Sequence, residues 1–377
     1  MNSVGAIVAV AGRRAFECNL PVPFEDQPSP GPRDRGGLSM ASRTGGLIGR
    51  MGPLAVAIAA AMWATDPYFR PALTQQLTAS QIVFVESLLI ALCFVPVAGR
   101  VRRELHHLPV RQWIAMGIIA LGAQAFATVL FTQALGYAFP AHAAPDFNVE
   151  NEVYLLYMLQ PVFGIAMARI FLKERRKPYF WPLAACAIVG VYLIVFPQSP
   201  LAPFSSVQHG QLLAAVLILG AVLLWASGTV FGRYSLSNVS FVTTAAMRFT
   251  LSLPVLLVLM LTGVGGGHLG RFSVQQIPSF IGIALVPGLL AMLLYYRALA
   301  STPASLASVA ELGYPCTLFL VFSLPAPVGL GLPLYPIEIV GALLLISVVT
   351  TLNVLKHRDV VETPERSEVA LAAEGGT

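Results

Sequence analysis

Ten apolar segments of about 20 residues constrain the fold of this chain more than any other feature. A helix needs about 20 residues to cross the roughly 30 Å hydrocarbon core of a bilayer, because each residue rises 1.5 Å. Only 11% of the 377 residues are charged, whereas soluble domains have about 25%. The sequence therefore predicts an all-α integral membrane protein with ten transmembrane helices. Their expected limits are 52–70, 80–98, 113–136, 150–172, 179–197, 211–231, 240–262, 278–298, 303–323 and 336–355.

The apolar segments fall into two similar halves. The run that begins at Trp63 reads Trp-Ala-Thr-Asp-Pro-Tyr-Phe, and the run that begins at Trp225 reads Trp-Ala-Ser-Gly-Thr-Val-Phe. A spacing of about 160 residues is far longer than a solenoid period and indicates a duplicated half-protein. We expect four parts, which are a disordered N-terminal tail (1–50), a first five-helix repeat (51–197), a second five-helix repeat (208–355) and a disordered C-terminal tail (356–377).

The positions of the basic residues predict the orientation. With a cytoplasmic N-terminus, 20 of the 23 Lys and Arg residues fall on the inner side, Arg70 and Arg271 fall in outer loops, and Arg248 falls within a span. Such an excess is typical of short cytoplasmic loops. We therefore expect a multi-pass protein of the cell inner (plasma) membrane with both termini in the cytoplasm. Because five spans is an odd number, the two repeats must be inverted, with a substrate site between them near mid-membrane.

Short strings in both halves carry a family resemblance. The first half has Leu-Gln-Pro-Val-Phe at 159–163 and Phe-Leu-Lys-Glu-Arg at 171–175. The second half has Tyr-Tyr-Arg-Ala-Leu at 295–299 and Thr-Pro-Ala-Ser at 302–305, followed by Glu311 and Pro315. In order, spacing and duplication these strings resemble the drug/metabolite transporter superfamily, specifically proteins with two EamA-type repeats. The resemblance implies a permease that exports small metabolites, amino acids or drugs by alternating access.

The chain departs from the family pattern in two places. The family commonly has an Arg in the second span of each half, as at Arg248, but Glu86 stands in the first copy. The second half also lacks a counterpart of the Leu-Lys-Glu string at 172–174. The first departure leaves open which substrate is bound, and the second is expected to affect only how a loop packs.

Charged side chains within the spans are candidates for a binding site. Each costs about 2.5–3.5 kcal/mol to insert, so it normally lines a cavity or has a partner. We expect Arg248 to bind an anionic group and Glu86 to bind a cationic group or a proton, which would couple transport to protons. Their levels differ by roughly 10 Å, which leaves a direct ion pair open. The alternative is that both are structural residues with separate partners.

Polar and aromatic residues extend this candidate site. Glu311 and Tyr314 share a helix face, and Gln160 is the approximate counterpart of Glu311 in the first half. Trp63 and Trp225 are interpreted as aromatic walls of a cavity, with a position at the membrane interface as the alternative. Asp66 is interpreted as a helix-end residue. The predicted substrate-binding residues are therefore Trp63, Glu86, Gln160, Trp225, Arg248, Glu311 and Tyr314.

Other classes of function find little support in the sequence. The glycines at 265–267 lack the context of a phosphate loop, and no His pair has metal-ligand spacing. We therefore predict no catalytic residue, no metal, no cofactor and no nucleic acid. Two alternatives stay open: a carrier of lipid or lipid precursor with the same fold, and a membrane enzyme with Glu86 and Glu311 as acid and base. Gly190 and Gly341 permit close helix contact, either within the chain or in a homodimer.

Overall fold

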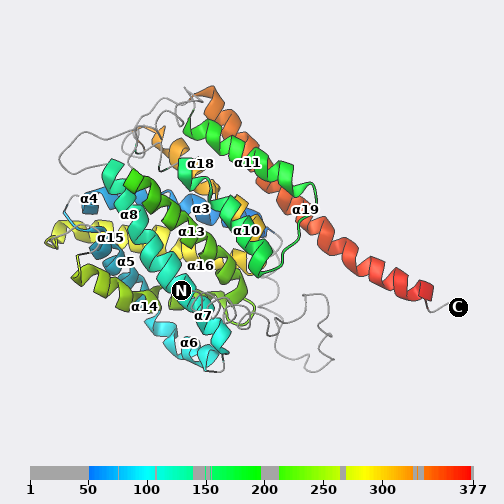
Figure 1. Ribbon diagram of the computed structural model, residues 1–377, viewed down its shortest axis with the longest axis horizontal. Helices are drawn as coiled ribbons and strands as arrows, with labels where there is room; N and C mark the ends of the chain where they lie inside the picture. The colour runs from blue at the N-terminus through cyan, green and yellow to red at the C-terminus, as the bar shows by residue number, and fades with distance from the viewer. Residues whose placement is uncertain are drawn as a thin grey trace, which may run out of the picture. The chain divides into compact units, whose positions relative to one another are not determined.

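The fold is known from a computed structural model. It describes residues 51–374 except 75, 107, 139–148, 150–152, 154, 197–211, 264–268, 326–328 and 330–334. The predicted N-terminal tail at 1–50 lies outside the described residues. Every regular element within the described ranges is a helix (Figure 1). The described chain belongs to one compact unit, Thr44–Thr377.

The helices follow the predicted spans, with breaks inside several of them. Those of the first half are α3 (Gly52–Trp63), η1 (Asp66–Tyr68), α4 (Arg70–Thr74), α5 (Ala79–Cys93), η2 (Val95–Val97), α6 (Ala98–Leu105), α7 (Val110–Gly117), η3 (Ile118–Phe126), α8 (Ala127–Ala138), α10 (Gln160–Phe171) and α11 (Phe180–Val195). Those of the second half are α13 (Leu212–Ser235), α14 (Phe241–Leu261), η4 (Val274–Gln276), α15 (Ile277–Ile283), η5 (Ala284–Leu290), α16 (Ala291–Leu299), α17 (Ala304–Ala310), α18 (Gly313–Phe322) and α19 (Pro336–Glu374).

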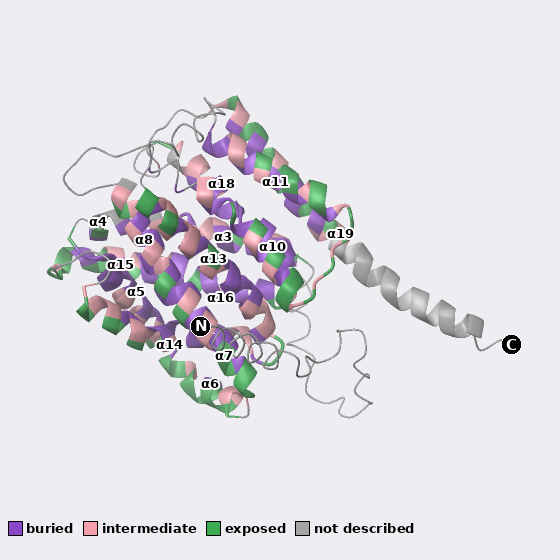
Figure 2. Cartoon of the chain, viewed as in Figure 1, coloured by how far each residue is buried: buried purple, intermediate pink, exposed green. Residues whose placement is uncertain are grey.

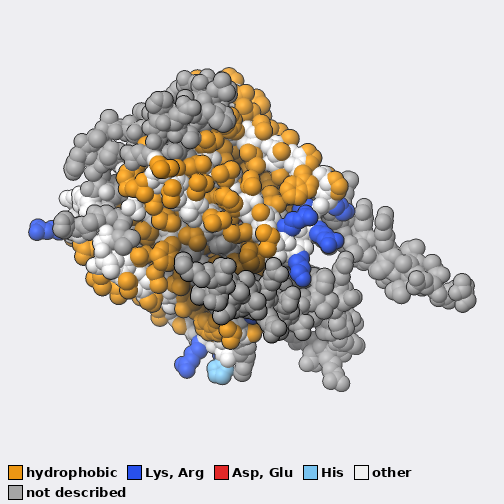
Figure 3. Space-filling model, viewed as in Figure 1, with side chains coloured by type: hydrophobic (Ala, Val, Ile, Leu, Met, Phe, Trp, Pro, Cys, Tyr) orange, Lys and Arg blue, Asp and Glu red, His pale blue; other side chains and the backbone are white. Residues whose placement is uncertain are grey.

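The lengths of these helices suit a bilayer. Six continuous helical stretches in the described chain are long and apolar enough to cross a membrane, and α5 with the η2–α6 segment passes the same test as a pair bent by 44°. Three shorter apolar helices are Gly52–Trp63, Leu155–Phe171 and Phe180–Val195. Figure 3 shows a surface dominated by hydrophobic side chains, as contact with lipid requires. The protein is thus a helical, multi-pass membrane protein, and the count of ten spans stays a prediction.

The second predicted span of each half begins with the same kind of helix N-cap. Thr78 precedes α5 and accepts a hydrogen bond from the backbone N–H of Gln81 at 3.3 Å. Ser240 precedes α14 and accepts one from the backbone N–H of Thr243, also at 3.3 Å. A hydroxyl at this position satisfies an otherwise free helix N–H and stabilises a helix by about 1 kcal/mol. Both caps stand 15 residues after the Trp of their half, at 63 + 15 and 225 + 15.

Helices α5 and α14 pack side by side, and the contacts at their ends show that they run in opposite directions. At the start of α5, the Gln81 carboxamide donates to the carbonyl of Gly270 and accepts from its N–H, each at 2.9 Å. At the start of α14, Glu104 accepts from the Ser240 N–H at 2.9 Å and from the Thr243 hydroxyl at 2.7 Å. The segment that follows each helix therefore reaches the beginning of the other helix.

Helices α11 and α19 pack closely through two glycines (Figure 1). A Cβ atom built on Gly341 would lie 2.3 Å from the carbonyl oxygen of Gly190, and one built on Gly190 would lie 2.8 Å from that of Gly341. The close contact that the sequence predicted for these glycines is thus formed within the chain. Helix α19 continues to Glu374, past the expected end of its span at 355.

Each half has a π-helical segment in its third apolar stretch. The first is η3, between α7 and α8, and the second is η5, between α15 and α16. Pro287 lies within η5 and has no N–H to donate, which favours a break in regular α-helical hydrogen bonding there. Such segments often mark functional sites. Figure 2 shows buried residues gathered in the interior of the helix bundle and exposed residues toward its edges.

Candidate functional site

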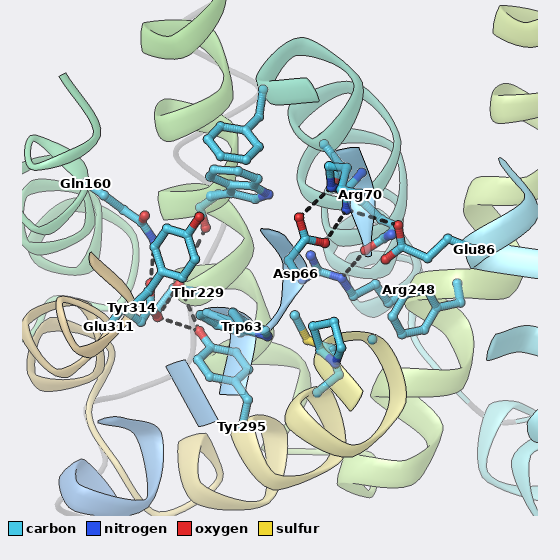
Figure 4. A pocket seen from close by; sticks show the side chains of 18 of the residues that line it. Trp63, Asp66, Arg70, Glu86, Gln160, Thr229, Arg248, Tyr295, Glu311 and Tyr314 are labelled. Carbon is cyan, nitrogen blue, oxygen red and sulfur yellow. Dashed lines mark hydrogen bonds and ion pairs between the residues drawn. The ribbon is translucent and has the colours of Figure 1, made fainter. Parts of the chain in front are cut away.

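A cavity of about 130 Å³ lies between the two halves (Figure 4). From the first half it is lined by Trp63, Asp66, Arg70, Glu86, Gln124, Thr128, Phe131, Tyr157 and Gln160. From the second half it is lined by Trp225, Thr229, Arg248, Phe249, Pro287, Gly288, Met292, Tyr295, Glu311 and Tyr314. All seven residues that the sequence analysis selected therefore line one cavity. Their binding of a substrate stays a prediction.

Arg70 is the centre of a charged network on one side of the cavity. Its Nε and Nη2 atoms donate to the two carboxylate oxygens of Asp66, at 2.5 and 2.6 Å. Nη2 also donates to Glu86 Oε2 at 3.3 Å, and Nη1 donates to Thr132 Oγ1 at 3.2 Å. The break between α3 and α4 brings Asp66 and Arg70 to this place, one helical turn apart. Two carboxylates therefore share one guanidinium.

The assignment of Arg70 to an outer loop is wrong, because the side chain is buried, with 7% of the residue exposed. Asp66 begins η1, as its interpretation as a helix-end residue requires, but it also lines the cavity. A signal for both was present in the sequence. An acid and a base four residues apart are neighbours on a helix face, and here they follow directly on an apolar segment.

Arg248 has only neutral hydrogen-bond partners among the described residues. Its Nε donates to Gln124 Oε1 at 2.7 Å, Nη1 donates to the Tyr296 hydroxyl at 3.3 Å, and Nη2 donates to the carbonyl of Ala123 at 3.2 Å. These contacts come from η3 and α16 and hold the guanidinium at the cavity. Glu86, in contrast, forms its ion pair with Arg70. The direct pair between Glu86 and Arg248 that the sequence left open is not among the ion pairs of the described residues.

Glu311 is the counterpart of Arg248 among the acids, since its hydrogen-bond donors are all neutral. Oε1 accepts from the Tyr295 hydroxyl at 2.7 Å and from Thr229 Oγ1 at 2.9 Å, and Oε2 accepts from Gln160 Nε2. Only 2% of Glu311 is exposed. Within the described chain it has no Lys or Arg within ion-pair distance. Burial of a carboxylate without an ion pair is costly, so a proton or a cation would stabilise this side chain.

Aromatic rings form two walls of the cavity. One wall contains Phe131, Trp225, Tyr157 and Tyr314, whose neighbouring ring centroids lie 5.0, 6.0 and 5.3 Å apart in that order. The other wall contains Trp63 and Tyr295, 5.3 Å apart. Both tryptophans thus take the cavity position that the sequence analysis preferred to one at the membrane interface. Tilted rings at these distances attract one another and make rigid apolar surfaces.

Two polar atoms of the lining have no hydrogen-bond partner in the described structure. They are the indole N–H of Trp63 and the carboxamide oxygen of Gln160, and both are buried. Buried polar groups are normally satisfied. One donor and one acceptor are therefore available to a molecule within the cavity.

The two carboxylates proposed for an enzyme reaction lie in different networks. Glu86 belongs to the network of Arg70, whereas Glu311 belongs to that of Tyr295 and Thr229. No hydrogen bond joins the two carboxylates in the part of the chain that the structure describes. Figure 4 shows the two networks on separate sides of the cavity. This arrangement suits the binding of a molecule with two charged groups better than acid and base catalysis at one bond.

Comparisons with known proteins identify a family and a similar transporter. The profile of the EamA-like transporter family matches residues 50–196 and 212–354. The riboflavin transporter ImpX of Fusobacterium nucleatum subsp. nucleatum is 29% identical over 299 residues, which cover 78% of this chain and 95% of that protein. One solved crystal structure has a TM-score of 0.58 and 13% identity, and the match covers 84% of this chain and 98% of that chain. That likeness shows the fold alone.

The family profile covers well over half of the chain in two consecutive repeats, and the relative that matches most of its length is a transporter. With its apolar helices and its internal cavity, this protein belongs to the EamA-like transporter family and is a membrane transporter of small molecules rather than an enzyme.

Proposed function

We propose that the protein is a secondary active transporter that exports a small, amino-acid-like zwitterion in exchange for protons. The observation that carries this proposal is the pairing of two unmatched charges in one cavity. Arg248 is a guanidinium without a carboxylate partner, and Glu311 is a carboxylate without a cationic partner, among the described residues. A zwitterion supplies both missing partners.

The substrate carboxylate is expected at Arg248. Three of the five guanidinium N–H groups have partners in the structure, which leaves two donors for a carboxylate. Charge-assisted contacts of this kind are about twice as strong as neutral hydrogen bonds. The substrate ammonium is expected at Glu311, beside the free carboxamide oxygen of Gln160. The two aromatic walls would hold an apolar or aromatic side chain between these ends.

The size of the cavity favours a small substrate. Its volume of about 130 Å³ is below the roughly 300–1,000 Å³ typical of pockets for drug-sized ligands. A larger molecule would fit only after the walls move apart.

The coupling proton is proposed to bind Glu311. The sequence analysis expected Glu86 in this role, but Glu86 has Arg70 as its counter-ion. The cavity holds three acids, Asp66, Glu86 and Glu311, and two bases, Arg70 and Arg248. Asp66 and Glu86 share Arg70 as their counter-ion, whereas Glu311 has no ion pair among the described residues. A proton and a substrate ammonium would neutralise it in turn, which is the requirement for exchange.

The transport cycle is proposed to be alternating access between two inverted five-helix repeats, with ten spans and both termini in the cytoplasm of the inner membrane. The opposite directions of α5 and α14 support this topology, since these helices hold the same place in the two halves. The π-helical segments η3 and η5 support a rearrangement at the cavity, because they border it from both halves.

A flavin is a second candidate substrate. The relative from Fusobacterium nucleatum is a riboflavin transporter, and aromatic walls are suited to a flat ring system. The present volume disfavours this candidate, because riboflavin requires a larger cavity than the one observed.

Transport assays in proteoliposomes test these proposals. Purified protein is reconstituted, and uptake of labelled L-phenylalanine, L-alanine, riboflavin and a labelled phospholipid is measured with and without a pH gradient. We expect phenylalanine flux that depends on the gradient and is inhibited by other zwitterions. Riboflavin flux without phenylalanine flux would support the second candidate, and phospholipid movement alone would support a lipid carrier.

A further inference from the structure

A second cavity, of about 370 Å³, lies away from the substrate-binding candidate, where the link between α10 and α11 meets α13 and α19. Four basic side chains line it: Arg175, Arg176, Lys177 and Arg233. Figure 3 shows Lys and Arg side chains gathered at an edge of the hydrophobic surface. The sequence explains this basic run as a topology signal. A signal of that kind requires positive charge in a loop, but it does not require a cavity.

The acid next to this cavity is already engaged. Glu174 accepts from the Ala304 N–H at 2.8 Å, and from the N–H and hydroxyl of Ser305 at 3.1 and 2.6 Å. It also accepts from Arg176 Nη2 at 2.9 Å. Among the described residues, Arg176 is the arginine of this cavity that has an ion pair, and Arg175 and Arg233 have none. These two arginines provide positive charge that an anionic ligand would match.

The basic side chains are directed by the local backbone. Lys173, just after α10, has a φ of 53°, which is uncommon for a residue other than glycine. The Glu174 N–H then donates back to the carbonyl of Ala168 at 3.2 Å. This tight turn places Arg175 to Lys177 at the cavity rather than along a continued helix. Within the cavity the Nε atom of Arg176 is buried and has no hydrogen-bond partner in the described structure.

Apolar side chains also line this cavity. Phe180, Leu306 and Leu352 are among its lining residues, and all three are buried. Trp181, the neighbour of Phe180, is 48% exposed, as is usual for tryptophan at the level of lipid headgroups. A cavity lined by both basic and apolar side chains matches a phospholipid, whose phosphate adjoins its acyl chains.

We propose that this cavity binds the phosphate group of an anionic phospholipid of the cytoplasmic leaflet. The positive-inside pattern places the α10–α11 link on that side, where anionic lipids and basic clusters attract each other. Free phosphate has the same headgroup chemistry, but the apolar residues of the lining favour the lipid. The inference does not rest on the proposed substrate or on proton exchange.

Lipid retention by the full-length protein tests the inference. The protein is purified in detergent, incubated with phosphatidylglycerol or phosphatidylcholine, and analysed by native mass spectrometry. We expect wild type to retain phosphatidylglycerol over phosphatidylcholine, and the double variant Arg175→Gln/Arg233→Gln to bind it at least roughly tenfold more weakly. Arg102→Gln is the matched control, because Arg102 is an exposed Arg of α6 outside this cavity. It should bind as wild type does.

Two further measurements keep the inference testable if the double variant is unstable. Photoactivatable phosphatidylglycerol should crosslink to wild type within 175–180 or near Arg233, and crosslinks confined to other helices would overturn the proposal. Inorganic phosphate is added in competition. If millimolar phosphate displaces the lipid completely, the site belongs to free phosphate and the lipid assignment is wrong. Equal retention of both lipids by wild type would also overturn it.

Discussion

At the scale of single residues, the cavity contains two kinds of buried carboxylate. Asp66 and Glu86 share Arg70 as a counter-ion, whereas Glu311 is held by three neutral donors. In the proposed mechanism, this difference in partners, and not a difference in residue type, selects Glu311 as the acid that exchanges a proton for a substrate ammonium. Only the three-dimensional arrangement makes the distinction visible.

The first prediction compares two carboxylates through the same chemical change. Glu311→Gln should abolish the dependence of phenylalanine flux on a pH gradient and weaken substrate binding at least roughly 30-fold, since removal of one partner of a buried charge pair costs about 2–5 kcal/mol. Glu86→Gln should keep that dependence. Flux and binding are measured in proteoliposomes and by calorimetry. Retained proton dependence in Glu311→Gln would transfer the role to another group.

The second prediction concerns Arg70. Arg70→Met should destabilise the protein by about 3–5 kcal/mol, because it leaves two carboxylates buried without a cation. Inactivation half-life at a fixed temperature is the suitable measurement for a membrane protein that unfolds irreversibly. The triple variant Arg70→Met/Asp66→Asn/Glu86→Gln removes all three charges and should recover much of that lifetime. If the triple variant inactivates as fast as Arg70→Met, the loss comes from packing instead of charge.

At the scale of elements, the nearest atom to each glycine in the contact between α11 and α19 is the backbone oxygen of the other. The third prediction is that Gly341→Ala lowers the thermal stability measured by intrinsic fluorescence, because its Cβ would lie 2.3 Å from a backbone oxygen of the neighbouring helix, so that the helices would have to shift. Gly136→Ala in α8 is the control, since nothing lies within 4 Å of its Cβ. That substitution should be neutral or stabilise by up to about 1 kcal/mol. Equal effects of the two changes would contradict the close packing.

Glu104 lies in α6, which follows α5 and also contains three arginines. Its hydrogen bonds with Ser240 and Thr243 link the first half to the second. Partial burial raises its pKa, but hydrogen bonds from Thr243 and Ser240, together with Arg100, outweigh that effect and lower the pKa to about 2. Since the carboxylate is favoured in the folded state, its stabilising contribution is present above the unfolded pKa of about 4.3. That contribution is lost as the pH falls toward about 2.

The fourth prediction follows from this lowered pKa of Glu104. Between about pH 4.5 and pH 2, wild type should lose more stability than Glu104→Gln, which lacks the ionised group. At pH 7 the variant should be the less stable of the two. The measurement is the thermal midpoint in detergent across this pH range. Parallel curves for the two proteins would show that Glu104 contributes no pH-dependent stability.

At the scale of the whole molecule, the sequence predicted the architecture better than it predicted which residues contact each other. The apolar segments and the repeated Trp runs were enough to predict a helical membrane protein of two similar halves, because span length and duplication are properties of the chain itself. The sequence also predicted that Trp63, Trp225 and Glu311 line one site, and all three line the cavity. The partners of these residues could not be predicted in this way. Gln160 meets Glu311 across 151 positions of sequence, which depends on how the helices pack.

The error at Arg70 has a physical cause. A basic residue near the end of an expected span is counted in a loop, because sequence gives its depth but not the direction of its side chain. The break after Trp63 turns Arg70 inward, toward Glu86. Likewise, Arg248 and Glu311 have no ion pair among the described residues because of the way the helices pack against each other. The spacing of residues within one segment does not predict this packing.

Proton release on substrate binding is the most direct test of the central claim, that substrate and proton occupy Glu311 in turn. L-phenylalanine is titrated into purified wild type by calorimetry in buffers of different ionisation enthalpy, at a pH where the unliganded carboxyl is largely protonated. We predict release of up to about one proton per molecule bound, by linkage between the two ligands, and none for Glu311→Gln. Binding by wild type without proton release at any pH between 5 and 9, or the same release from the variant, would contradict the account.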